Sequence, residues 1–566
     1  MSFAAKIREL GPFDALLGTS TSNGKPWQPV VPDHERAHLE PLDREPDPRD
    51  PRAITRVGVI GGGTAGYLTA LALRKKLPWL DVTLVESSRI PVIGVGEATT
   101  PPLLAFLHHY LEIDPHDFHE KVQPTWKLGI RFDGWGPHPD GFMAPFDWGE
   151  NSVGVLGSLA AQGDPNAYTL QSLFMMADKV PVFDGPVSLM DSIPFAYHLE
   201  NRRLVSYLTA LARSRGIRHL DTEIASVDVS DEWVSGLQTK DGQRLEFDLY
   251  IDCTGFRSLL LGKALGTEYI SYADSLFTDT AITGYLPQPD VMEPYTRADC
   301  MDAGWCWNIP VPDEDHVGYV HSSAFLSEDA AADELCRHHK GVDDLKTVRF
   351  RVGRHRKMWR GNVIGIGNSY GFVEPLESSA LLMLTFTIMA LMPLIPRSWN
   401  EPNAAEALNE VTGQRWDGLR WFLALHYRFN QRRDTEFWRE VRATANIDGA
   451  RPLLDVFATG APLHHRDAFT RRLVRAAAPT FYELDGVDCV LLGNGVPHTL
   501  VRTSEPLDAW KARKSAADQL VARALPHREG LKAFRTHPEL VDELVNSPTS
   551  WLARYGSERW LLATNA

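Results

Sequence analysis

The sequence contains few cysteines, no Cys-x-x-Cys pair and no strongly basic segment, and each absence argues against a class of function. Its five cysteines are scattered and odd in number, which argues against both a disulfide framework and a zinc site and fits a reducing cytoplasm. The formal net charge is −15, without clusters of lysine or arginine. Nucleic acids and anionic membranes are therefore poor partners for this chain, because both attract basic clusters.

Long apolar runs are also absent. The longest nearly apolar segment, residues 381–395, is interrupted by two threonines and Pro393 and is shorter than the roughly 20 residues of a membrane helix. We expect a buried helix there and no membrane span. The chain shows no charged start followed by an apolar stretch, so we expect no secretory signal. Pairs of consecutive histidines lack the spacing of metal ligands, so we expect solvated surface and no metal site at positions 108/109, 338/339 and 464/465.

The composition predicts a globular protein of two or three domains. The chain has 566 residues, of which 43% are hydrophobic and 23% charged, so it can bury a large core. Residues 32–51 are crowded with proline and charged residues, and we predict an N-terminal arm or linker over residues 1–55. Residues 56–400 are predicted to form the core. Residues 401–566 show a helical pattern and are predicted to form a largely helical C-terminal region.

A nucleotide-binding pattern opens the predicted core. Residues 56–60 form a short apolar strand that leads directly into the glycines of residues 61–66. Residues 65–76 carry leucines at helical spacing, and a second apolar strand follows at residues 81–86. This order predicts a helix that connects two parallel strands. A tight turn in an unrelated α/β protein is the alternative interpretation.

The spacing of the glycines is that of dinucleotide-binding proteins. Gly61, Gly63 and Gly66 stand between strand and helix, where glycine turns the chain, lets the backbone approach a pyrophosphate and lets the helix pack on the strand. Thr64 and Ala65 then stand at the helix N-terminus, which faces the phosphates. Glu86 closes the second strand and is placed to accept hydrogen bonds from ribose hydroxyls.

Two later segments favour FAD over NAD as this dinucleotide. Residues 250–257, which include Asp252, and residues 365–368, which include Gly367, resemble the strand-end turns that surround the flavin in FAD monooxygenases. The fold class that this resemblance implies is α/β, a Rossmann-type flavin domain with a mixed sheet. Because no second glycine fingerprint is present, we expect a separate NAD(P)H-dependent reductase to supply the reduced flavin.

Further motifs resemble one particular group of flavoproteins. Trp305-x-Trp307-x-Ile309-Pro310 is similar to the Trp-x-Trp-x-Ile-Pro motif of flavin-dependent halogenases, and the chain resembles the tryptophan halogenase family from about residue 56 to about residue 500. The other matching stretches are residues 94–99, 351–354, 372–379 and 433–438. The first of these implies cofactor contacts by Glu97, Ala98 and Thr99.

The resemblance implies that reduced FAD (FADH2), oxygen and chloride produce hypochlorous acid, which travels through the protein to a distant aromatic ring. Lys127 corresponds to the lysine of the family's active site, where a cation holds and polarises the oxidant. In a strand, alternation would place Lys127 on the face opposite Trp126 and Leu128. A solvated surface charge is the alternative for an isolated strand lysine.

The other implied site residues follow from the same comparison. Glu377 corresponds to a carboxylate that polarises the oxidant or accepts the ring proton, and an acid at a helix N-terminus is its alternative interpretation. Ser379 and Ala380 match the Thr-Gly pair of the halide site, where alanine narrows the space. Trp305 and Trp307 would separate flavin from substrate, or simply pack in the core.

Departures from the family concern the substrate. In members that act on free tryptophan, a His and a Phe hold the indole; here Ala144 stands at the His position and Phe146 is retained. A Tyr pair that clamps the amino-acid backbone aligns with Val487 and Asp488. The charged ends of free tryptophan would therefore lack partners, and we predict a tryptophan within a peptide, as in lanthipeptide halogenation. Residues 149–180 form either a hydrophobic entrance or ordinary loop and helix packing.

Several alternatives stay open at this point. Free tryptophan, another indole or a carrier-bound pyrrole are other substrates. A flavin-dependent aromatic hydroxylase shares the nucleotide fold but needs no Lys127 and Glu377. A catalytically silent flavin- or peptide-binding scaffold is the non-enzymatic alternative. The ring position, the halide preference and the oligomeric state, including a homodimer, are not indicated by the sequence.

Overall fold

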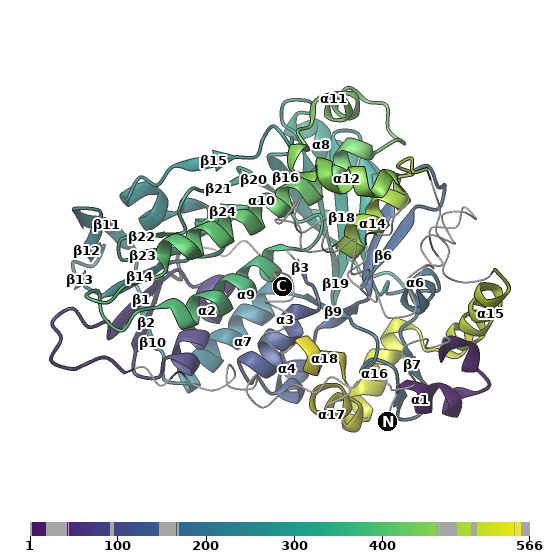
Figure 1. Cartoon of the computed structure of the whole chain (residues 1–566), viewed down its shortest axis with the longest axis horizontal. Helices are drawn as coiled ribbons and strands as arrows, with labels where there is room; N and C mark the ends of the chain where they lie inside the picture. Colours follow the sequence, from purple (N-terminus) through teal and green to yellow (C-terminus); the bar gives the residue numbers. More distant parts are fainter. Residues whose placement is uncertain are drawn as a thin grey trace.

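The computed structural model of the chain describes residues 3–17, 42, 45–90, 96–146, 166, 169–459, 463, 484–499, 507–547 and 550–555. Two large sheets dominate the molecule, and helices from both halves of the chain cover them (Figure 1). The mixed α/β class predicted from the sequence is confirmed.

A six-stranded sheet forms the predicted nucleotide-binding core. Its strand order is β10-β2-β1-β14-β23-β22. The bounds of these strands are Arg218–Asp221 (β10), Asp81–Glu86 (β2), Arg56–Ile60 (β1), Leu249–Asp252 (β14), Val363–Gly365 (β23) and Trp359–Arg360 (β22). All neighbouring pairs are parallel except β22 with β23. Helix α2 (Thr64–Lys76) connects β1 to β2 and packs on β2 and on α7 (Asn201–Ser214). The predicted strand–helix–strand opening is thus confirmed.

A seven-stranded sheet lies beside this core. Its order is β20-β16-β19-β18-β17-β5-β6, and only β17 and β5 pair in parallel. The bounds are Asp343–Arg349 (β20), Thr280–Pro287 (β16), Glu314–His321 (β19), Gly304–Pro310 (β18), Thr296–Met301 (β17), Gly129–Asp133 (β5) and Phe142–Pro145 (β6). Helix α8 (Glu328–His338) packs against β16 and β19.

The two faces of this sheet belong to different cores. Along β18, Trp305 and Trp307 contribute to the main hydrophobic core, whereas Cys306 points to the other face and joins a small cluster beneath α8. This separation follows from the alternation of side chains along a strand.

Smaller sheets fill the space around the two large ones. One has the order β3-β9-β4, with bounds Glu97–Ala98, Ala196–Leu199 and Thr125–Lys127. The others contain β11 (Ile224–Ser230), β12 (Trp233–Thr239) and β13 (Arg244–Leu245); β15 (Tyr269–Ser271), β21 (Gly353–His355) and β24 (Gly371–Phe372); and β7 (Val182–Phe183) with β8 (Val187–Ser188).

Helices account for the regular structure described after residue 400, as the sequence predicts. They are α10 (Ala405–Phe429), α11 (Glu436–Thr444), α12 (Arg451–Ala458), α14 (Leu484–Gly493), α15 (Leu507–Arg523), α16 (His527–Thr536), α17 (Pro538–Asn546) and α18 (Trp551–Tyr555). Before them, the apolar segment around residue 385 forms the buried helix α9 (Ala380–Leu391). Shorter helices in the first half are α1 (Phe3–Leu10), α3 (Pro102–Ala105), α4 (Pro115–Lys121) and α6 (Leu170–Met176). No described helix is both long and apolar enough to cross a membrane.

The first part of the predicted arm is packed against the body. Ile7 and Leu10 of α1 are buried, and the Nζ atom of the buried Lys6 lies 2.8 Å from carboxylate oxygens of both Asp191 and Glu543. Figure 1 shows α1 beside β7 and α15, at the lower right of the view. Most of the proline-rich segment, residues 32–51, lies outside the described residues.

The expected exposure of the paired histidines is wrong for the first pair. His108 is buried, and its ring nitrogens lie within hydrogen-bonding distance of the Ile113 carbonyl and the Tyr197 hydroxyl. Burial lowers the pKa of His108 to about 4, so its ring is neutral. The pair 464/465 lies outside the described residues.

The expected division of the lysine segment into a polar and an apolar face is also wrong. The chain leaves one sheet after Lys127 and enters another at Gly129, while the Leu128 N–H donates to the Pro294 carbonyl. Every side chain from Thr125 to Ile130 is buried. Packing from two sheets therefore encloses Lys127, which strand alternation alone does not predict.

Candidate active site

The glycine turn after β1 has the shape that a bound dinucleotide requires. Gly61 has φ +119°, and a Cβ there would clash with the Cys253 carbonyl. A Cβ at Gly66 would clash with the Gly61 carbonyl, so the first turn of α2 can approach the strand only because this position is glycine. A Cβ at Gly63 would meet nothing within 4 Å. Open space thus lies at Gly63, beside the N-terminus of α2, where anions are stabilised.

Polar groups at the edge of this turn fit the rest of a dinucleotide. The hydroxyl of Thr64, at the start of α2, is buried and has no hydrogen-bond partner. Glu86 ends β2, and its Oε1 accepts hydrogen bonds from the Tyr67 hydroxyl at 2.7 Å and from His219 Nε2 at 2.5 Å. Gly367 has φ +65°, and a Cβ there would lie 3.2 Å from the Cβ of Ala65. The glycine turn and the predicted flavin turn at residues 365–368 are therefore neighbours.

Asp252 has a structural role in the predicted flavin segment at residues 250–257. Its Oδ1 accepts hydrogen bonds from the backbone and hydroxyl of Thr254, and its Oδ2 accepts from the backbone of Leu260 and Leu261. The carboxylate therefore fixes the turn after β14. Direct contact of Asp252 with the cofactor stays a prediction.

The segment Glu97–Thr99 is linked to the lysine strand through one small sheet. Strand β9 pairs with β3 on one side and with β4 on the other, so His198 lies opposite both Ala98 and Thr125. The Thr99 hydroxyl donates to the Tyr197 carbonyl at 2.7 Å. Burial raises the pKa of Glu97 to about 7, against the effect of the hydrogen bond from Asn201. The predicted cofactor segment and Lys127 thus share a rigid support.

A cavity joins the flavin turn to the predicted halide residues. Its lining includes Gly367, Asn368, Phe372, Ser379 and Ala380. Ser379 is the N-cap residue of α9, and its buried hydroxyl has no hydrogen-bond partner. Backbone N–H groups at a helix start lack partners within the helix and favour anions. The residues present therefore fit both a flavin and a halide.

Lys127 is completely buried and is held by two neighbours. Its Nζ donates a hydrogen bond to the Ser378 hydroxyl at 2.6 Å and lies 5.3 Å from the centre of the Phe146 ring. Burial lowers the pKa of Lys127 from its ordinary 10.5 to about 7, and the negative charge of Glu377 opposes this shift. Ser378 has φ +54°, a left-handed conformation that is costly for serine and is often found at functional sites.

Glu377 is paired with a histidine that the sequence does not indicate. His426 is buried on α10, and its Nε2 lies 2.6 Å from the Glu377 Oε1. Its Nδ1 lies 3.0 Å from the Phe422 carbonyl, which can only accept, so Nδ1 carries a proton. The buried ring of His426 therefore holds the Glu377 carboxylate in place.

The two tryptophans lie next to the segment that carries Glu377. Their ring centres are 6.0 Å apart and both side chains are buried. The Trp305 indole lies beside the buried Glu374, which accepts hydrogen bonds from Thr278 and Tyr427. Burial raises the pKa of Glu374 to about 7, against the effect of these donors. The Trp-x-Trp strand thus packs against the segment that carries Glu374 and Glu377, which agrees with both interpretations of the motif.

The predicted substrate residues also lie close to one another. Helix α14 lies against β6, where the Cys489 thiol donates to the Met143 carbonyl at 3.2 Å. The replaced positions Ala144 and Val487 are therefore on neighbouring elements. Residues 149–165, the larger part of the predicted entrance, lie outside the described residues.

Sequence reasoning missed the partners of the two candidate catalytic residues. Ser378 was only part of a matching stretch, and His426 stands in an apolar helical run without a motif that indicates its role. The contact between Glu377 and His426 joins residues 49 positions apart. The packing of α10 against α9 brings the two residues together.

Fold and motifs together define a flavin-dependent enzyme with a Rossmann-type FAD domain, in which the buried Lys127 and its neighbours form the candidate active site. The model of the family "Tryptophan halogenase" matches residues 56–508. The chain therefore belongs to the tryptophan halogenase family, whose members use FAD and a halide, an aromatic substrate and, in general, a separate flavin reductase.

Individual relatives agree with this assignment. KtzR from Kutzneria sp. (strain 744), a 7-chloro-L-tryptophan 6-halogenase, is 31% identical over 478 residues, which cover 78% of this chain and 90% of KtzR. RebH from Lentzea aerocolonigenes, a tryptophan 7-halogenase, is 31% identical over 437 residues, covering 72% and 82%. Among solved structures, MibH, a lanthipeptide tryptophan 5-halogenase, is 55% identical with a TM-score of 0.87, covering 90% of this chain and 99% of MibH.

Proposed function

We propose that the protein chlorinates the indole ring of a tryptophan within a peptide, with hypochlorous acid as the oxidant. The observation that carries this proposal is the completely buried Lys127 ammonium, which donates to Ser378 and lies within the field of Glu377. A buried cation without a catalytic or ion-pairing purpose is costly. A flavin hydroxylase, which transfers oxygen directly from the cofactor, gives no reason for such a group.

The cofactor site in this proposal is the glycine turn and the cavity beside it. Reduced FAD, oxygen and chloride supply hypochlorous acid when they are bound. The pyrophosphate would lie against Gly61, Gly63 and Gly66, and Glu86 would accept hydrogen bonds from the ribose. Ser379 and Ala380 would hold chloride at the start of α9. Trp305 and Trp307 would keep the peptide away from the flavin, so that only the small oxidant passes.

At the lysine end, the side chains act on the oxidant and on the ring. The ammonium of Lys127 donates a hydrogen bond to the oxygen of hypochlorous acid, which makes its chlorine more electrophilic. The indole ring attacks this chlorine and becomes cationic while the O–Cl bond breaks, and the departing hydroxide takes a proton from the Lys127 ammonium to form water. The pair of Glu377 and His426 then accepts the ring proton, and aromaticity returns. A hydrogen bond of 2.6 Å holds the carboxylate in place for this step.

A peptide substrate is favoured over free tryptophan by the residues around the ring site. Ala144, Val487 and Asp488 replace the side chains that bind free tryptophan in related enzymes. An amide-linked tryptophan carries neither an ammonium nor a carboxylate group, so it needs no such partners. The likeness to the lanthipeptide halogenase MibH, at 55% identity, supports the same substrate class.

Mass spectrometry of competing substrates tests the proposal. The enzyme would be incubated with a flavin reductase, NADH, FAD, oxygen and chloride, together with equal amounts of a tryptophan-containing peptide and of free tryptophan. We expect chlorinated peptide as the main product, and no product without chloride. Preferential chlorination of free tryptophan would contradict the substrate class, and a hydroxylated product would contradict the reaction.

A further inference from the structure

The end of helix α8 meets strand β17 on the face of the seven-stranded sheet that points away from the tryptophans. Asp299 of β17 pairs in register with Cys306 of β18, and Cys306 belongs to the small core beneath α8. Trp305 and Trp307 occupy the opposite face. Any site formed here is therefore separated from the halogenation site by the sheet itself.

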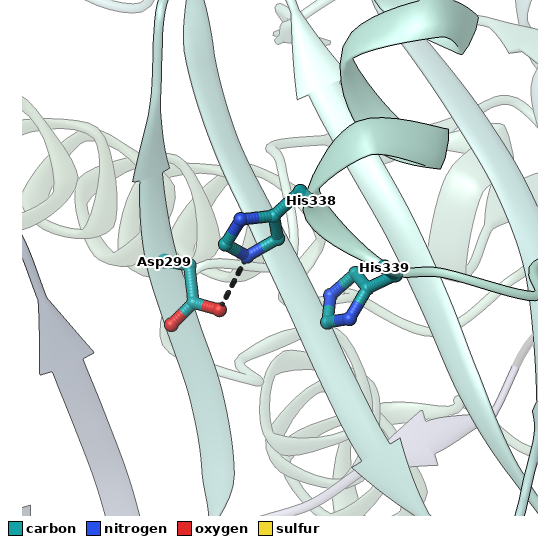
Figure 2. A group of neighbouring side chains, drawn as sticks. All are labelled: Asp299, His338 and His339. Carbon is teal, nitrogen blue, oxygen red and sulfur yellow. Dashed lines mark hydrogen bonds and ion pairs between the residues drawn. The ribbon is translucent and has the colours of Figure 1, made fainter.

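Three side chains that can bind metals converge at this place. His338 is the last residue of α8, and its Nε2 lies 2.8 Å from the Asp299 Oδ2. His339 follows in an extended conformation, with φ −116° and ψ +99°. This turn of the chain brings two consecutive rings together, with their centres 4.5 Å apart. Figure 2 shows Asp299, His338 and His339 as neighbours at the end of the helix.

We propose that Asp299, His338 and His339 form a binding site for a divalent transition-metal ion, with zinc as the expected occupant. One ligand atom from each residue lies within 4.8 Å of the others. Two imidazole nitrogens and one carboxylate oxygen suit zinc, at about 2.0–2.2 Å from each ligand atom. Two ligand atoms in one tetrahedral shell stand about 3.4 Å apart. His338 Nε2 and Asp299 Oδ2 are 2.8 Å apart, so these two atoms need to separate only slightly to hold a metal ion between them. Water would complete the shell.

The surrounding groups prepare the carboxylate for this role. Arg297 lies 3.3 Å from Asp299 Oδ1, on the oxygen that His338 does not use. This arrangement orients Oδ2 towards the histidines, as the outer partners of metal ligands commonly do. The Nε2 atom of His339 is buried and has no hydrogen-bond partner, so coordination at this ring breaks no existing bond within the described residues.

The local charge also favours a cation. Arg297 lies within ion-pair distance of three carboxylates, those of Asp133, Glu293 and Asp299. Arg131, which pairs with Asp133, is the second guanidinium of the group. Three acids and two guanidiniums leave one excess negative charge once Glu293 is ionised; burial raises the pKa of Glu293 to about 7, so the excess is present above that pH. A divalent cation would offset this excess.

A metal at this position would tie α8 to the sheet. The helix rests on a small core of its own, formed by Ile282, Met301, Cys306, Tyr319, Ala331 and Leu335. Because a metal that binds only the folded state stabilises it by mass action, we expect zinc to raise the thermal stability of the protein without changing its chemistry.

Zinc titration of the full-length, FAD-loaded enzyme tests the site. After removal of metals with a chelator, binding of Zn²⁺ would be followed by calorimetry and by the unfolding temperature. We expect one equivalent to bind with micromolar affinity and to raise the unfolding temperature by several degrees. When Co²⁺ replaces zinc, the protein should show the visible absorption bands of a four-coordinate Co²⁺ ion.

Two ligand variants and one control make the result specific. His339→Gln and Asp299→Asn should each weaken zinc binding by about 100-fold and abolish the gain in unfolding temperature. His537→Gln serves as the matched control, because His537 pairs with Glu539 at 3.2 Å but, among the described residues, belongs to no group of three potential metal ligands. Equal zinc binding by wild type and His339→Gln, or no stoichiometric binding by wild type, would overturn the proposal. Because Asp299 also pairs with Arg297, Asp299→Asn changes more than the metal ligand, and the result for His339→Gln decides whether the site exists.

Discussion

The two ends of the proposed active site are built by different means. At the cofactor end, the backbone defines the shape: Gly61 and Gly66 allow close approaches that any side chain would prevent, and Gly63 leaves open space. At the lysine end, buried side chains define the chemistry, with Lys127 on Ser378 and Glu377 on His426. The first arrangement is specified by a local sequence pattern, although Gly61 approaches the distant Cys253, whereas the second is assembled entirely from residues far apart in the sequence. The following predictions test whether the two ends are functionally separate.

Removal of the lysine should have the largest effect. In Lys127→Ala, we expect chlorination to fall by about 1,000-fold, because the oxidant is neither held nor polarised. FAD affinity should be unchanged, since the glycine turn is untouched; fluorescence titration measures it. Lys127→Met keeps most of the side-chain volume, so it is the matched control for a collapse of the structure around a smaller side chain. Normal turnover in either variant would remove Lys127 from the mechanism.

Loss of the acid–histidine pair should have a smaller effect at the same end. We expect Glu377→Gln to lower turnover by about 100-fold and His426→Gln by about 10-fold, because the ring proton loses its acceptor or the acceptor loses its support. The KM for the peptide should change little in both variants, as steady-state kinetics will show. Wild-type turnover in Glu377→Gln would disprove its role.

Substitution of the glycines at the cofactor end should change the affinity for FAD. Gly66→Ala places a Cβ against the Gly61 carbonyl, and we expect it to cost about 1–3 kcal/mol of stability together with weaker FAD binding. Gly63→Ala is the matched variant. Its Cβ enters open space and its φ is −80°, so stability should be retained while FAD affinity falls. Unchanged FAD affinity in Gly63→Ala would show that the pyrophosphate does not lie there.

The pH dependence should distinguish Lys127 from an ordinary lysine. Since burial lowers the pKa of Lys127 to about 7, the ammonium is lost as pH rises above that value, and turnover should fall by about 10-fold per pH unit. Lys127→Arg, whose guanidinium stays charged, should lack this decline even if its activity is low. A profile of wild type that is flat from pH 6 to pH 9 would contradict a need for the ammonium.

The same shift has a consequence for stability. Between pH about 7 and 10.5 the folded protein binds fewer protons at Lys127 than the unfolded chain, so this residue makes stability rise with pH. Its cost to the fold is complete below pH 7 and disappears towards pH 10.5. Lys127→Met should therefore be more stable than wild type at pH 6, and the difference should vanish at high pH in denaturant unfolding.

The smallest effect is expected at the halide residues. The resemblance to the family implies glycine at the position of Ala380, and Ala380 lines the same cavity as Ser379. We expect Ala380→Gly to raise the ratio of bromination to chlorination by about 3-fold, in line with the small energy of one methyl group. Competition between the two halides, followed by mass spectrometry, measures this ratio. A lowered ratio would place the halide elsewhere.

The difference between the two ends also explains what the sequence could predict. The strand, the glycine turn and α2 are consecutive, so their pattern predicts their structure within a residue. Lys127 was indicated only by resemblance, and alternation could not predict its burial because the chain changes sheets at Leu128. His426 and Ser378 acquire their roles through contacts with distant residues, which no local pattern records. Asp252 fits its flavin segment, but its carboxylate is used by its own turn.

A trapping experiment tests the central claim most directly, because it follows the oxidant itself. Wild type and Lys127→Ala would each be given reduced FAD, oxygen, chloride, a tryptophan-containing peptide and an excess of a soluble thioether that consumes free hypochlorous acid. We predict that wild type chlorinates the peptide despite the trap, whereas Lys127→Ala oxidises the trap and leaves the peptide unmodified. Chlorinated peptide from Lys127→Ala in the presence of the trap would contradict the account.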